Sequence, residues 1–173
     1  MRRILYFNAE TLKEATSINT NVDDHYLENA IWEAHEINIQ QVCGTALYRK
    51  IAALIDAGTL ILPANSHYKT LVDDYLVPMG IYYAWLNSIT YIRFKTMNKG
   101  VQDQSSDNSS ASDLKNVEFL RNDIRQKAEY FMQRVIDYLL ENHALYPEYK
   151  SNNGRDQIRP NTRPQKCSIV FDC

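Results

Sequence analysis

The chain has 173 residues, of which 45% are hydrophobic and 23% are charged, and its formal net charge is −2. This length predicts a single domain with its own core, and the composition is that of an ordinary soluble globular protein. The slightly negative charge argues against a generally basic nucleic-acid-binding protein. The three cysteines are too few for a disulfide framework, which indicates a reducing compartment.

The N-terminal part predicts a short strand followed by helices. The strand is expected within residues 1–7, and Asn8 is expected to cap a helix that reaches Ala15. A longer helix is predicted to start at Asp23 or Asp24, where an acidic residue suits the helix dipole. The apolar run at the start is too short for a signal peptide and acidic residues follow it.

Glycines are expected to end the next two helices. The helix from residue 23 or 24 is predicted to end near Cys43, with Gly44 just past its end. A third helix is predicted over residues 45–57, with Gly58 as its stop. The connector that follows is expected to pin two apolar side chains to the core, those of Leu60 and Leu62.

The middle of the chain predicts a buried helix and then a long loop. Asn65 is expected to cap a helix that continues to about Lys95. Pro78 is expected to kink or break it, because proline removes one hydrogen bond and crowds the preceding turn. Residues 75–92 are apolar but contain proline, glycine and polar side chains, which favours a core helix over a membrane span. The serine-rich residues 97–112 predict a mobile loop.

A long final helix is predicted over residues 113–142, with apolar side chains on two faces. Such a helix is buried between two neighbours, or between its own core and another subunit, and the sequence leaves both alternatives open. Twelve tyrosines in the chain leave the same choice between a hydrogen-bonded core and an interface. The candidates for a subunit interface, from the loop and from this helix, are Lys99, Asp103, Asp107, Phe131, Met132, Val135, Ile136 and Tyr138.

Residues 150–173 are expected to form an extended basic arm, distinct from a helical domain of residues 1–149. Five cations and two anions give the arm a net charge of +3, which leaves −5 for the rest of the chain. The arm ends in a short β-prone run, residues 168–171, which is an aggregation hazard unless it is covered. It is expected to pair with residues 1–7 or with a strand of another chain, and a tail without function is the remaining alternative. The residues expected to bind a partner are Arg155, Arg159, Arg163, Lys166, Ile169, Val170 and Phe171.

The sequence shows no convergent set of catalytic groups. None of the five glycines forms a phosphate-binding loop, and no two histidines have the four-residue spacing of a helical metal site. Cys167 and Cys173 would supply at most half of a zinc site. The chain is therefore predicted to be a mainly α, single-domain bundle of four to five helices that is not an enzyme and has no cofactor, metal site or membrane span.

Four segments carry a family resemblance: GTALYRKIAALIDAGTL, PANSHYKTLVDDYLVP, NKGVQDQSSDNSSAS and YFMQRVIDYLLENHALYPEY. Together they resemble the head–tail connector proteins of tailed phages that infect gut Bacteroidales, including the crAss-like phages. The resemblance covers roughly residues 5–150 and lies in whole segments. It implies a twelve-fold adaptor ring in the virion neck, beneath the portal, with DNA passing through the centre.

On this resemblance the expected partners are further copies of the chain, the portal protein, adjacent neck or tail ring proteins, and double-stranded DNA contacted without sequence specificity. The protein would be assembled in the host cytoplasm and reside in the virion. The basic arm would tie one protomer or ring to the next, because its cations suit an acidic surface. The alternative is a cytosolic helical nucleic-acid-binding or regulatory module that uses the basic tail.

Overall fold

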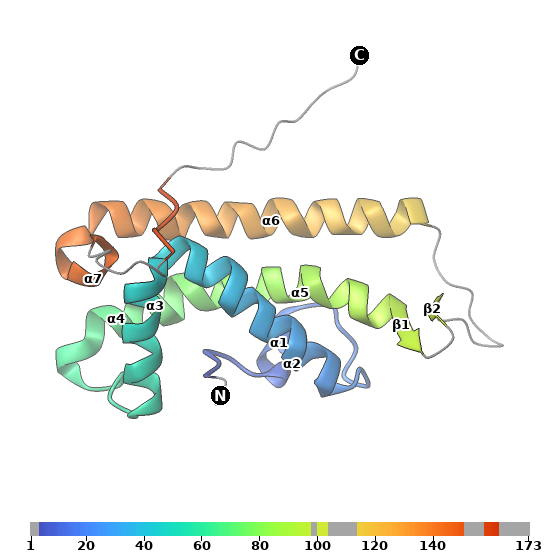
Figure 1. The fold of residues 1–173 in the computed structure, drawn as a ribbon, viewed down its shortest axis with the longest axis horizontal. Coiled ribbons are helices and arrows are strands. Elements are labelled where there is room, and N and C mark those ends of the chain that lie inside the picture. The colour runs from blue at the N-terminus through green and yellow to red at the C-terminus, as the bar shows by residue number, and fades with distance from the viewer. Residues whose placement is uncertain (1–3, 98–99, 104–113, 151–157, 163–173) are drawn as a thin grey trace, which may run out of the picture.

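The computed structural model describes residues 4–97, 100–103, 114–150 and 158–162, and it is mainly helical (Figure 1). The predicted fold class, a mainly α bundle, is confirmed. The elements in chain order are α1 (Ala9–Ala15), α2 (Asp24–Glu33), the π-helical turn η1 (Ala34–Ile39), α3 (Gln40–Asp56), the 3-10 turn η2 (Pro63–Asn65), α4 (Ser66–Thr70), the π-helical turn η3 (Leu71–Leu76), α5 (Val77–Arg93), β1 (Phe94–Met97), β2 (Gly100–Asp103), α6 (Leu114–Glu141), the 3-10 turn η4 (His143–Leu145) and α7 (Pro147–Lys150).

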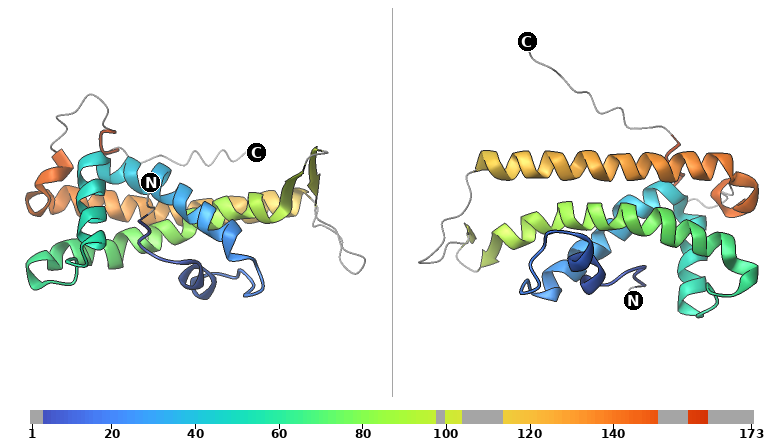
Figure 2. Two further views of the ribbon diagram at one scale, coloured as in Figure 1. Left: turned by 60° about the horizontal axis from the view of Figure 1, so that its bottom comes forward. Right: turned by 180° about the vertical axis from the view of Figure 1, so that it is seen from behind.

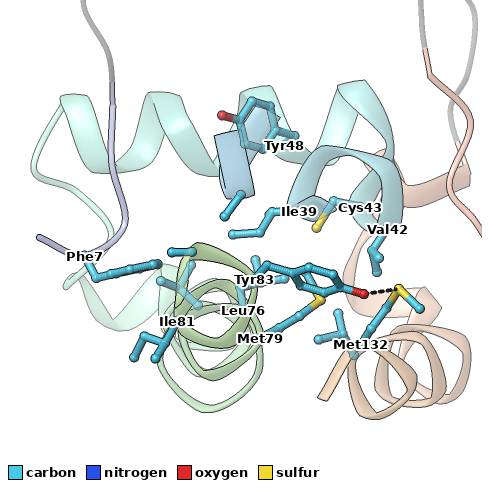
Figure 3. Close-up of a cluster of buried hydrophobic side chains, with 14 of the residues drawn as sticks. Phe7, Ile39, Val42, Cys43, Tyr48, Leu76, Met79, Ile81, Tyr83 and Met132 are labelled. Carbon is cyan, nitrogen blue, oxygen red and sulfur yellow. Dashed lines mark hydrogen bonds between the residues drawn. The ribbon is translucent and has the colours of Figure 1, made fainter. Parts of the chain in front are cut away.

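Helix α5 is the centre of the bundle. It packs against α2 and η1 on one side and runs alongside the long helix α6 on the other (Figures 1 and 2). The hydroxyl of Tyr83 on α5 contacts Sδ of Met132 on α6 at 3.4 Å, and the rings of Tyr82 and Phe131 stack with centroids 5.0 Å apart. Figure 3 shows this core, where side chains from η1, α3, α5 and α6 meet.

The N-terminal segment is not a strand over its described part, residues 4–7, so that prediction is wrong. Phe7 instead lies in the core against Gly80 of α5, where a Cβ would stand only 2.8 Å from the Phe7 ring. The Phe7 side chain anchors this segment to α5, and a β-prone sequence pattern does not predict such a contact. The predicted cap of α1 is confirmed, because Oδ1 of Asn8 accepts a hydrogen bond from the amide of Thr11 at 2.8 Å.

The two helix-ending glycines are confirmed, and both have positive φ. Gly58 follows the end of α3 with φ 66°. Gly44 has φ 74° and ψ 158°, a conformation that is essentially restricted to glycine. Gly44 lies inside α3, so this helix consists of two parts that meet at a break.

Two expectations for the middle of the chain need correction. Asn65 does not cap a helix with its side chain; its Nδ2 donates to the carbonyl oxygen of Thr59 at 2.8 Å and closes the connector. Pro78 was expected to kink or break the helix, and the break does not occur, because the chain runs from η3 directly into α5. The widened turn η3 comes just before it, and the amide of Val77 donates to the carbonyl of Val72, five residues back. A π turn of this kind lets a helix pass a residue that has no amide hydrogen.

The predicted loop after α5 is partly a β-hairpin. Strands β1 and β2 pair antiparallel, with Phe94 opposite Asp103 and Met97 opposite Gly100. The remainder of that prediction, residues 98–99 and 104–112, lies outside the described residues. The long final helix is confirmed as α6. Within the described ranges, no helix is both long and apolar enough to cross a membrane.

Candidate interaction site

The α6 side chains expected at a subunit interface pack wholly or partly against the core of this chain. Met132, Val135 and Ile136 are buried against the neighbouring helices, and Phe131 and Tyr138 are half-buried. The ring of Tyr138 stacks on that of Tyr75 with centroids 4.0 Å apart. The three buried side chains have no surface to offer a second subunit, which corrects their assignment as interface candidates. Of the loop candidates, Asp103 is in β2, and Lys99 and Asp107 lie outside the described residues.

Among the several large apolar side chains that are exposed in the described residues, two pairs are considered as interaction surfaces. On α6, Phe119 and Tyr130 are 78% and 62% exposed; they are eleven residues apart, about three helical turns, and so share one face. We call them the α6 surface. In the connector before η2, Ile61 is 75% exposed and lies beside exposed Leu62, and we call this pair the connector surface. Leu60 packs on the core as predicted, but Leu62 does not.

The two surfaces lie on different elements of the bundle. In the view of Figure 1, helix α6 runs along one edge of the molecule and the connector between α3 and α4 lies at the opposite edge. Phe119 and Tyr130 were not among the interface residues predicted from the sequence, because neither lies on the two apolar faces expected for this helix. Their eleven-residue spacing was the signal that could have found them.

A third feature connects distant parts of the chain. Residues 158–162, the C-terminal segment, lie on residues 41–45 of α3, which we call the α3 break. The amide of Thr45 donates to the carbonyl oxygen of Ile158 at 3.1 Å, and the amide of Asn161 donates to that of Gln41 at 2.9 Å. The amide of Ile158 donates to Oγ1 of Thr45 at 2.9 Å.

The C-terminal segment provides hydrogen-bond partners for two backbone groups of α3 that cannot bond to each other. In a continuous α-helix the amide of Thr45 would donate to the carbonyl of Gln41, four residues earlier. The conformation of Gly44 separates these two groups. The C-terminal segment supplies a separate partner to each of them. Pro160 lies directly on Gly44, where a Cβ would stand 2.8 Å from its Cγ and Cδ atoms.

Gly44→Ala is expected to lower the free energy of unfolding by about 2 kcal/mol, because the backbone conformation is strained for any other residue and the new methyl group would collide with Pro160. Urea unfolding would measure this loss. Hydrogen exchange at the Ile158 and Asn161 amides would also accelerate.

Gly58→Ala is the matched control for that substitution. Gly58 also has positive φ, but a Cβ there would meet nothing within 4 Å. Gly58→Ala should therefore lower the stability somewhat through backbone strain and leave amide hydrogen exchange at residues 158 and 161 unchanged. Persistent protection of those amides in Gly44→Ala would contradict the role given to the break.

Only a part of the predicted basic arm lies within the described residues. Arg159 is exposed on the C-terminal segment, and this segment packs on the helical domain instead of extending away from it. The other predicted arm residues lie outside the described residues; they are Arg155, Arg163, Lys166, Ile169, Val170 and Phe171. Pairing between the two predicted terminal strands is likewise not described.

The tyrosines at one end of the bundle form a hydrogen-bonded cluster. The hydroxyl of Tyr146 donates to the carbonyl of His67 at 2.8 Å, so the hydroxyl of Tyr138, 3.0 Å away, donates to Tyr146. The hydroxyl of Tyr68 donates to Oε2 of Glu148 at 2.9 Å, and its burial and this bond raise the pKa of Tyr68 to about 12. These contacts favour the first of the two alternatives for the tyrosines in this cluster, a hydrogen-bonded core and not a subunit interface.

His35 is a buried polar group in η1 with both ring nitrogens occupied. The amide of Tyr6 donates to Nε2 at 3.0 Å, so Nδ1 carries the hydrogen and donates to the carbonyl of Ile31 at 2.7 Å. Burial lowers the pKa of His35 to about 4. The ring therefore stays neutral near neutral pH and joins the N-terminal segment to η1. In the described part of the chain, His35 belongs to no group of three or more residues that could hold a metal ion.

The fold and the contacts define a helical-bundle protein with a C-terminal segment that fills a break in one of its own helices. The chain belongs to a family of unknown function, DUF6712, whose model matches residues 39–159. The matched range contains the whole α3 break and the first two residues of the C-terminal segment. No curated protein and no solved structure matches the chain.

Proposed function

We propose that the protein is a structural, non-enzymatic component of a tailed-phage neck that assembles into a closed ring of about twelve copies between portal and tail. Its support from the sequence is the resemblance of four segments to phage head–tail connectors. The structural observation that carries it is the pair of apolar surfaces at opposite edges of the bundle. A ring needs two different, complementary surfaces on each copy.

The exposed side chains are the kind that a protein interface buries. Single apolar residues on a surface are normal, but Phe119 and Tyr130 share one face of α6, and Ile61 and Leu62 are adjacent. Aromatic residues are enriched at interfaces, where they provide much of the binding energy. In the proposed ring, the α6 surface of one copy contacts the connector surface of the next.

The portal protein and the adjacent neck or tail rings are the proposed external partners. Arg159 is exposed on the docked segment, and eleven residues follow Thr162, with Arg163 and Lys166 among them. These cations suit an acidic partner surface. The rest of the chain is acidic, so it would not bind DNA that passes through the ring. The protein would reside in the virion.

Native mass spectrometry of the chain, alone and with portal protein, tests this function. A closed oligomer near twelve copies in either sample is the expected result. Phe119→Asp and Ile61→Asp should each abolish that species, because a charge would be buried at the contact. Circular dichroism should show that both variants remain folded, since the two side chains are exposed.

Leu145→Asp is the control, because Leu145 is exposed on η4 and belongs to neither surface. It should leave the oligomer intact. A chain that stays monomeric or dimeric and ignores portal would rule out the ring. Salt-dependent binding to DNA by that small species would instead support the nucleic-acid-binding alternative.

A further inference from the structure

The α3 break is a binding site for an extended backbone segment. It presents one donor, the amide of Thr45, and two acceptors, the carbonyl of Gln41 and Oγ1 of Thr45. Between them Gly44 provides a flat surface without a Cβ, on which Pro160 lies. Proline suits this position because it has no amide hydrogen that would need a partner.

The break is costly to leave empty. Gly44 and Thr45 are both buried, and without the segment the amide of Thr45 would lose its hydrogen-bond partner. The docked segment itself covers these two residues, so its loss would both break the hydrogen bonds and expose the break to water. A chain whose own segment is displaced therefore gains by taking up an equivalent segment from elsewhere.

A second copy of the chain offers that equivalent segment. The three hydrogen bonds and the contact of Pro160 with Gly44 do not depend on whether the segment belongs to the same chain. Seven residues, 151–157, connect α7 to the segment, and they span at most about 25 Å when extended. Exchange of an identical element between copies is a low-cost route to association.

We propose that the α3 break of one copy binds residues 158–162 of a second copy, so that the chains associate by exchanging their C-terminal segments. The exchange keeps every contact of the docked segment, and these noncovalent contacts then hold two copies together, because each segment stays covalently joined to its own chain. This inference goes beyond the proposed neck function, because it holds for any assembly in which two copies come within reach of the connecting residues.

The test uses two full-length copies with different tags, both carrying Cys167→Ser and Cys173→Ser. One copy carries Gln41→Cys and the other Asn161→Cys; residues 41 and 161 contact each other through backbone atoms, so the contact survives both substitutions. The copies are refolded together and treated with a short bis-maleimide reagent, which does not demand disulfide geometry. Cys43 should not react, because it is fully buried and its thiol pKa is raised to about 12.

The expected result is a cross-link between residues 41 and 161 of different copies, identified by peptide mapping, whose yield rises with protein concentration. Adding Gly44→Ala to the Gln41→Cys copy should reduce this yield at least fivefold. A single chain with both cysteines reports docking within one chain. Cross-linking only within that chain, with none between copies at any concentration, would overturn the proposal, and so would an intercopy yield that Gly44→Ala leaves unchanged.

Discussion

Ile136→Ala is expected to lower the free energy of unfolding of the isolated chain by about 3 kcal/mol. Ile136 is fully buried on α6 and packs in the core between that helix and its neighbours. Removing most of its side chain loses hydrophobic burial and leaves a cavity that a packed core closes only in part. The effect should appear in urea unfolding of the chain alone, at a concentration too low for assembly.

Leu140→Ala is the matched control for this substitution. Leu140 lies one helical turn further along α6 and is 42% exposed. It should cost well under half as much stability, because less of its surface is buried and water can fill the space. If Ile136→Ala left the stability of the isolated chain unchanged but blocked oligomer formation, Ile136 would be an interface residue after all, and the core assignment of this stripe would be wrong.

The stability of the chain is also expected to fall as the pH is lowered from 6.5 towards 4, with about 3 kcal/mol of the loss due to His35. In the folded chain burial lowers the pKa of His35 to about 4, whereas an unfolded histidine titrates near 6.5. Between these values the unfolded chain binds a proton that the folded chain does not. The contribution is therefore complete above pH 6.5, decreases as the pH falls, and is fully lost below about pH 4.

Protonation would also break a specific contact. Nε2 of His35 accepts the amide hydrogen of Tyr6, and a protonated ring has no acceptor to offer there. The N-terminal segment, including Phe7, should therefore detach from η1 and α5 early in acid unfolding. Hydrogen exchange at the Tyr6 amide, followed from pH 7 to pH 5, would show this locally.

His35→Gln is the variant that separates titration from packing. A glutamine can accept from the Tyr6 amide and donate to the Ile31 carbonyl, but it does not titrate. It should be less stable than the parent chain at pH 7 and lose less stability between pH 6.5 and pH 5. Equal slopes for the two proteins in that range would show that His35 is not the source of the acid sensitivity.

Local features of the sequence were sufficient where a single residue determines the backbone. Asn8 caps α1, and Gly44 and Gly58 stand at helix ends, because a side-chain acceptor and a positive φ act within a few residues. The periodicity of α6 likewise predicted a long helix, since one buried face repeats every three to four residues. The sequence alone did not determine which apolar face of α6 packs against the core of the same chain.

Tertiary packing decided the features that depend on partners far along the chain. Residues 4–7 follow a β-prone pattern, but His35 and Gly80 hold them as an irregular segment. Pro78 passes without a break because η3 widens the preceding turn. These outcomes depend on contacts between distant residues, which local propensity does not contain.

The sequence by itself determined that this protein is a mainly helical bundle with a helix boundary at Gly44, because helix-forming periodicity and glycine conformation are local properties. Only the tertiary structure decided what that boundary does. In the folded chain Ile158 and Asn161 lie against Thr45 and Gln41. The backbone groups that Gly44 separates therefore bond to a segment that begins 113 residues after Thr45. Backbone groups released in a buried place must find partners, and no local pattern specifies where those partners come from.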